Sequence, residues 1–143
     1  MINPEISLEM LNSEANNPPI SRYLGIEFTE IGPDYVCAKM PVDKRNHQPM
    51  GILHGGVSVV LAETLGSVGA WLCIDTKKYY CVGLEINANH IRSVRSGYVY
   101  GKATLLHAGR MTQVWEVKIT NEEQKLVCVS RITMAVVPIS EMR

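Results

Sequence analysis

The sequence has no surplus of charge of either sign, because 14 Lys and Arg residues balance 14 Asp and Glu residues. The basic residues are scattered along the chain, so they form no cluster that would attract a nucleic-acid backbone or an anionic membrane surface. We therefore expect neither nucleic acid nor a membrane among the partners of this protein.

The chain also lacks a C-x-x-C pair and an N-terminal secretory signal. Its four cysteines stand at irregular separations, and its first residues do not form a basic segment followed by an apolar one. We expect a reducing, cytoplasmic compartment in which the thiols pack as small apolar side chains. No metal site is predicted, because His47 and His54 have no second pair of ligands near them.

The chain does have enough apolar residues for one packed core. Of its 143 residues, 46% are hydrophobic, and about 100 to 200 residues make one domain. At this length about 68 to 70% of the surface of the unfolded chain can be buried. We therefore expect a single folded domain over residues 1–143 rather than a disordered chain.

Local patterns predict an α+β fold. A short helix capped by Ser7 is expected to end at Asn16-Asn17-Pro18-Pro19, with a loop after it. Strands over residues 26–31 and 35–42 flank the turn Gly32-Pro33-Asp34. Period-2 alternation in the second half predicts a meander of four antiparallel strands. These strands are expected over residues 80–95, 98–108, 111–120 and 126–137.

The most apolar stretch, residues 55–74, contains one charged residue, Glu63, and no proline. We expect one helix there, since residues 57–74 would extend over about 27 Å at the helical rise. A membrane span is rejected, because a carboxylate in mid-span costs about 3 kcal/mol to insert and the strands need a helix to cover them. A helix that is apolar on nearly every side is instead expected to be buried within its own protein.

Glu63 is unexpected in such a helix, because carboxylates are excluded from apolar cores unless they are paired or functional. Ser67 and Trp71 follow four and eight residues later, so the three side chains share approximately one helix face. This face is a candidate catalytic surface. The alternatives are an ion pair between Glu63 and a strand arginine, and ordinary core packing of Trp71; for Ser67 the catalytic and structural roles both stay open.

His54, Gly55 and Gly56 precede this helix, where the first N–H groups have no internal acceptor and the helix dipole is positive. Two residues without Cβ would let a carbonyl oxygen approach these N–H groups, as in an oxyanion hole. Alternatively, the glycines only turn the chain into the helix.

Gly55 and Glu63 are eight residues apart, which is about 10 to 12 Å along a helix axis. They cannot hold one carbonyl group together within one chain. If both act on one group, they come from two chains with antiparallel helices, which predicts a two-fold dimer with sites at its interface. Four small residues would allow such close approach, or would serve packing against the sheet. They are Ala62, Gly66, Gly69 and Ala70.

The sequence contains no G-x-S-x-G motif and is too short for an α/β-hydrolase. A carboxylate acting as base or nucleophile, with a helix-terminal amide that polarises a carbonyl, suits acyl transfer from an activated donor to water.

Residues 24–133 resemble the hotdog-fold acyl-CoA thioesterases, in particular the phenylacetate-pathway, enterobactin-proofreading and 1,4-dihydroxy-2-naphthoyl-CoA thioesterases. The likeness runs through PVDKRNHQPMGILHGGVSVVLAETLGSVGA and GLEINANHIRSVRSG. The combination of H-G-G with a mid-helix Glu is specific to this branch. The resemblance implies a hotdog fold, in which an antiparallel sheet wraps a long central helix, and a homodimer with shared sites that commonly doubles to a homotetramer.

The resemblance also implies roles for individual residues. Glu63 would be the catalytic carboxylate, the Gly55 N–H would polarise the carbonyl, and Gln48 would contact the thioester oxygen. Ser67 would orient water or the carboxylate, and His54 would lie beside the leaving sulfur. The implied binding residues are His90 near the pantetheine or acyl group, Arg92 and Arg95 at the CoA phosphates, and Met50 and Trp71 along the acyl pocket.

These assignments have structural alternatives, since His90 would also suit a core and arginines at a strand end are often only solvated. An aromatic acyl group, such as benzoyl or 1,4-dihydroxy-2-naphthoyl, could stack on Trp71. The expected activity is hydrolysis of acyl-CoA to a free acid and CoA, with CoA as part of the substrate and no separate cofactor. The alternatives are a hotdog dehydratase and a non-catalytic acyl-CoA-binding module.

Overall fold

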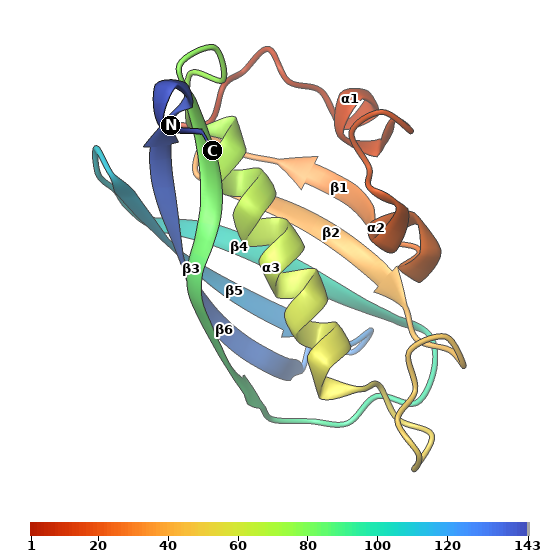
Figure 1. The fold of residues 1–143 in the computed structure, drawn as a ribbon. Coiled ribbons are helices and arrows are strands. Elements are labelled where there is room, and N and C mark those ends of the chain that lie inside the picture. Colours follow the sequence, from red (N-terminus) through yellow and green to blue (C-terminus); the bar gives the residue numbers. More distant parts are fainter. Residues whose placement is uncertain (143) are drawn as a thin grey trace.

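The computed structural model describes residues 1–142. One curved sheet of six antiparallel strands, in the order β1-β2-β4-β5-β6-β3, wraps a long helix, α3 (Figure 1). This is the hotdog fold that the family resemblance implied. The strands are β1 (Glu27–Ile31), β2 (Tyr35–Pro41), β3 (Tyr79–His90), β4 (Tyr98–Ala108), β5 (Thr112–Thr120) and β6 (Leu126–Pro138). The helices are α1 (Leu8–Asn12), α2 (Pro19–Leu24), α3 (Gly55–Leu72) and the short 3-10 helix η1 (Ile139–Glu141).

One side of α3 packs on the sheet. Its buried residues are Ser58, Leu61, Ala62, Leu65, Gly66, Gly69, Ala70 and Leu72. A Cβ atom on Gly69 would lie 2.9 Å from the ring of Trp115 on β5, and one on Gly66 would overlap Ile132 of β6. The small residues therefore fit α3 to its own sheet, and this packing accounts for them without a second helix.

The opposite side of α3 is not covered by the sheet. Glu63 is exposed, and Ser67, Val68 and Trp71 are half-buried. The expectation that α3 is buried on nearly every side within one chain is therefore wrong, because a single sheet covers only one side of a helix. By length and composition α3 could cross a membrane, but 44% of it is buried inside this fold, as in the core helix of a sheet-wrapped protein.

The strand bounds are largely as expected, but the predicted four-strand meander is wrong for β3, which pairs with β6 rather than with β4. The first neighbour of β4 is instead β2. On β5, Gln113, Trp115, Val117 and Ile119 are buried together. However, β3 ends at His90 rather than at residue 95. The chain leaves the sheet there because it pairs with the loop before α3: the Leu53 N–H donates to the Val94 carbonyl at 2.8 Å, and His47 Nε2 lies 2.8 Å from the Arg95 carbonyl oxygen.

The N-terminal helices flank the first strand (Figure 1). Ser7 caps α1 by accepting the Met10 N–H at 3.2 Å, as expected. The loop expected after Pro19 is wrong, because Pro19 begins α2, and the first helical position tolerates proline since its missing N–H has no acceptor there. Asn12 fixes α1 to β1 through the Phe28 backbone, with Asn12 Nδ2 2.9 Å from the carbonyl and Oδ1 2.8 Å from the N–H.

Candidate active site

The loop between β2 and α3 is held at both ends. Asn46 is 3% exposed; its Nδ2 donates to the Pro41 carbonyl at 2.8 Å, and its own carbonyl accepts the His54 N–H at 2.8 Å. At the surface the Arg45 guanidinium and backbone N–H bond the Asp43 carboxylate, and lower its pKa to about 2. Sequence analysis missed Asn46, since a polar residue in a polar loop carries no periodic signal.

The first turn of α3 presents an N–H without an acceptor. His54 caps the helix, because its Nδ1 accepts the Gly56 N–H at 2.9 Å. The Gly55 N–H takes part in none of the hydrogen bonds formed by residues 1–142. The His90 imidazole lies directly over Gly55, since a Cβ atom on that glycine would stand 2.9 Å from His90 Nε2. His90 is exposed, so the alternative of a core histidine is wrong.

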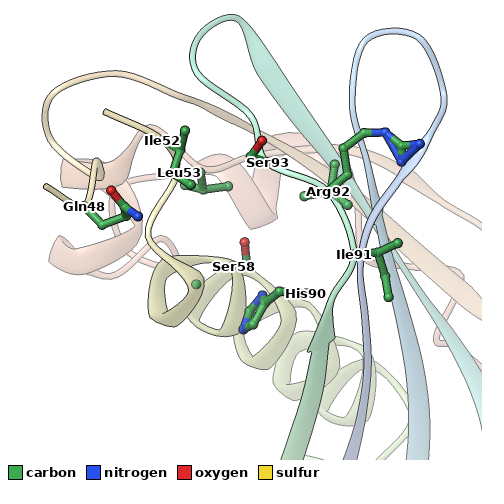
Figure 2. A pocket seen from close by; sticks show the side chains of 10 residues that line it. Gln48, Ile52, Leu53, Ser58, His90, Ile91, Arg92 and Ser93 are labelled. Atoms are coloured by element: carbon green, nitrogen blue, oxygen red, sulfur yellow. The ribbon is translucent and has the colours of Figure 1, made fainter. Parts of the chain in front are cut away.

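A pocket of about 330 Å³ opens at this end of α3 (Figure 2). Four segments build it: the loop before α3, the first turn of α3, the end of β3 with the chain that leaves it, and the start of β6. The lining residues are Gln48, Ile52, Leu53, Gly55, Ser58, His90, Ile91, Arg92, Ser93 and Val127. Sequence analysis missed Ser58 here, since a serine in an apolar helix looks like any small residue.

The Gln48 side chain is oriented by its own loop. Its Oε1 accepts the Met50 N–H, which leaves the Nε2 amide as the donor group. Gln48 therefore adds a second potential donor to the pocket of the Gly55 N–H. Met50 itself is 69% exposed and lines neither this pocket nor that of Trp71.

A second pocket, of about 480 Å³, lies along the uncovered side of α3. Glu63, Ser67 and Trp71 line it together, as their helical spacing predicted. The other lining residues are Leu11, Ala15, Asn16, Pro18, Phe28, Thr64 and Val68. Its walls are mostly apolar, and α1 with the segment after it forms one of them.

Glu63 belongs to none of the ion pairs within residues 1–142, so the structure offers no support for a strand arginine as its partner. Its Oε1 lies beside Gly83 of β3, where a Cβ atom would stand 3.0 Å away. The Ser67 hydroxyl is 4.0 Å from the Met134 sulfur, a weak contact that leaves it free for a better partner.

The two halves of the expected catalytic group therefore occupy separate pockets. Gln48, Gly55 and His90 share the first, with Arg92, whereas Glu63 faces the second. Arg92 is exposed, and its guanidinium reaches the Leu126 carbonyl at 3.5 Å. Arg95 lies in neither pocket but in a third cleft beside Glu122 and Glu123, where its Nη1 donates to the Met50 carbonyl at 3.2 Å.

Comparison with known proteins adds an independent finding. The family described as the thioesterase superfamily matches residues 50–128. A 1,4-dihydroxy-2-naphthoyl-CoA hydrolase of Escherichia coli is 48% identical over 92% of this chain and 96% of that protein. A proofreading thioesterase of Cronobacter turicensis is 46% identical over 92% of this chain and 94% of that protein.

Solved structures agree with these relatives. A thioesterase of Haemophilus influenzae is similar with a TM-score of 0.93 and 47% identity, covering 99% of this chain and 98% of that one. A mutant thioesterase of Pseudomonas aeruginosa is similar with a TM-score of 0.92 and 49% identity, covering 96% of this chain and 99% of that one. The likeness therefore extends over nearly the whole fold.

Proposed function

This chain belongs to the thioesterase superfamily, and from that premise we propose that it hydrolyses acyl-CoA to a carboxylic acid and CoA, with Glu63 as the acting carboxylate. The observation that carries the proposal is the place of Glu63. It is the one charged residue of α3, it has no cation partner among residues 1–142, and it stands at the wall of an apolar pocket. A carboxylate at the wall of an apolar pocket suits a binding or catalytic site better than a structural core.

The proposed site takes its parts from two subunits. The Gly55 N–H and Glu63 lie about 12 Å apart along α3 and line different pockets. The uncovered side of α3 and the edge strand β3, with the exposed Val82 and Leu84, offer an apolar surface to a second copy. We infer a two-fold homodimer in which the Gly55 end of one subunit meets Glu63 of the other, and a pairing of such dimers into a tetramer.

In the proposed reaction the thioester carbonyl oxygen accepts hydrogen bonds from the Gly55 N–H and Gln48 Nε2. Glu63 either deprotonates a water that attacks the carbonyl carbon, or attacks it directly to form an anhydride that water then cleaves. A new C–O bond replaces the C–S bond, and the CoA sulfur leaves with a proton. Ser67 would orient the water or the carboxylate, and His54 would lie beside the leaving sulfur.

The two pockets suggest how the substrate is bound. His90 and Arg92 beside Gly55 suit the pantetheine arm and a CoA phosphate, while Arg95, beside two glutamates, is the weaker candidate for a phosphate. The acyl group would enter the pocket of Trp71, where an aromatic ring can stack on the indole. The E. coli relative named for a naphthoyl-CoA substrate supports an aromatic acyl group, and benzoyl-CoA is the simplest probe. Met50 does not line this pocket in its own subunit, so in the proposed dimer it would contact the acyl group bound in the pocket of the other subunit.

The test is thiol release from benzoyl-CoA by wild type and Glu63→Gln. We expect the variant to lose at least about a hundredfold in kcat, since a positioned acid or base contributes 10² to 10⁴, while it still binds the CoA ligand. Glu116→Gln is the matched control, because Glu116 pairs with Lys118 away from both pockets, and it should retain wild-type turnover.

Full turnover by Glu63→Gln would remove Glu63 from the mechanism. Ligand binding without thiol release in wild type would favour the binding module, and water loss from a hydroxyacyl-CoA would favour the dehydratase. A single turnover in labelled water tests the direct route, since label in the Glu63 carboxylate requires an anhydride that water opens at the Glu63 carbonyl carbon.

A further inference from the structure

Ser58 shares the pocket of the Gly55 N–H, and the proposed function, on which this inference rests, gives it no role. It is the fourth residue of α3, 2% exposed, and it lines the same pocket as Gly55 and His90. Figure 2 shows its hydroxyl pointing away from the helix, into the space below Leu53 and Ser93. A buried polar side chain is therefore aimed into the pocket at the helix N-terminus.

The Ser58 hydroxyl has no partner within residues 1–142. Serines inside helices often bond the carbonyl four residues earlier, which here belongs to His54. That carbonyl already accepts the N–H groups of Val57 at 2.9 Å and Ser58 at 3.3 Å, and the Ser58 hydroxyl forms no hydrogen bond with it. Buried hydroxyls normally have a partner, so an open pocket in front of this one points to a partner that arrives with the substrate.

The geometry of a helix directs Ser58 toward Gly55. Every Cα–Cβ bond in a helix tilts toward the N-terminus, so a side chain covers the turn that precedes its own Cα. Residues three apart also share a helix face. The hydroxyl of Ser58 therefore lies over the turn that begins with the Gly55 N–H, and both groups face the same pocket.

We propose that the Ser58 hydroxyl donates a hydrogen bond to the thioester carbonyl oxygen held at the Gly55 N–H. The hydroxyl supplies one O–H donor, and it stands in the positive field of the helix N-terminus. The bond strengthens as negative charge builds on the oxygen while the carbonyl carbon is attacked. Because Ser58 is 2% exposed, this donor acts in a partly water-excluded position, where preorganised donors are most effective.

The test compares Ser58→Ala with Ser130→Ala in the thiol-release assay with benzoyl-CoA. Ser130 of β6 is a matched control, because it is also 2% exposed and its hydroxyl is also without a partner, but it lines neither the Gly55 nor the Glu63 pocket. Loss of one oxyanion donor lowers kcat by about 10² to 10³. We expect a fall in kcat of about a hundredfold for Ser58→Ala, with KM changed less than about threefold, and wild-type kcat for Ser130→Ala.

Ser58→Cys separates the donor from the volume of the side chain, since a thiol is a weak donor of nearly the same shape. We expect its kcat to fall nearly as far as that of Ser58→Ala, with the melting temperature retained. Wild-type kcat in Ser58→Cys, or a rise in KM without a fall in kcat in Ser58→Ala, would overturn the assignment of Ser58. Absence of thiol release from any acyl-CoA by wild type would overturn the proposed function instead.

Discussion

The Glu63 side chain illustrates what a residue type reveals by itself. A carboxylate in an apolar helix marks a function or an ion pair, and this argument needs no coordinates. The exposure of Glu63 could not be inferred in the same way, since it depends on which side of α3 the sheet covers. The same holds for Ser58 and Asn46, whose types are common and whose importance follows only from what surrounds them.

The cysteine thiols provide a prediction at this scale. Burial, with a smaller contribution from Cys73 nearby, raises the pKa of Cys81 from 9.0 to about 11. At pH 8 the thiol is therefore almost wholly protonated and reacts slowly with iodoacetamide. Mass spectrometry of the labelled peptides should show Cys81 labelling slowly at pH 8 and faster as the pH rises toward 11.

The same shift has a consequence for stability. A group that holds its proton more tightly in the folded state stabilises the fold below its ordinary pKa, and this contribution is lost as the pH rises through the folded value. Unfolding free energy should therefore decrease between about pH 9 and pH 11. Labelling of Cys81 at pH 8 as fast as that of a denatured control would contradict both expectations.

Among the elements, α3 was predicted from the sequence more accurately in its ends than in its packing. Periodicity located this helix to within two residues at each end, because apolar spacing and the H-G-G start are local signals. The glycines within it were ambiguous, since helix-to-helix and helix-to-sheet contact call for the same small residues. The structure decides for the sheet, because Gly66 and Gly69 contact Ile132 and Trp115.

Gly66→Ala tests this packing. Alanine gains about 1 kcal/mol in helix propensity, but its Cβ would overlap the Ile132 side chain, and overpacking of a core costs about 1 to 3 kcal/mol. We expect a net loss of unfolding free energy, measured by urea denaturation. Thr64→Ala, on the uncovered side of α3, is the control and should change stability by less than about 1 kcal/mol. A Gly66→Ala protein more stable than wild type would show that the Ile132 side chain moves away from the new methyl group at little cost.

α2 and the end of β3 show where local signals are insufficient. The pair Pro18-Pro19 reads equally well as the end of one helix or the start of the next. The alternation after His90 continued in the sequence, yet the chain leaves the sheet because Val94 pairs with Leu53 on a distant loop. Both outcomes depend on partners that lie far away along the chain.

At the scale of the whole molecule, the shared site can be tested by mixing subunits. Glu63→Ala removes the carboxylate. Gly55→Pro removes the N–H at the first position of α3, where proline is tolerated in a helix. Each variant alone should be inactive. In hybrid dimers one of the two sites retains both an intact Gly55 and an intact Glu63, so mixing after mild denaturation should restore up to about a quarter of the wild-type activity, given random pairing of two-fold dimers.

The matched control for this experiment is each variant refolded alone, with native mass spectrometry to confirm that hybrids form. Inactive hybrids that are folded and present in the expected proportion would show that each site lies within one subunit. They would leave the fold and the thioesterase family of the chain unchanged, and would place Gly55 and Glu63 in separate roles.

The sequence by itself determined the order and type of most elements, the unusual carboxylate of α3 and the H-G-G entry to that helix, because periodicity, capping and residue chemistry act over a few neighbouring residues. Only the tertiary structure decided which side of α3 is covered, and that His90, Ser58 and Gln48 meet around Gly55. Those contacts arise from the curvature of the sheet and from the exit of the chain after β3. Both bring together segments that are distant in the sequence and show no local pattern that would predict their contact.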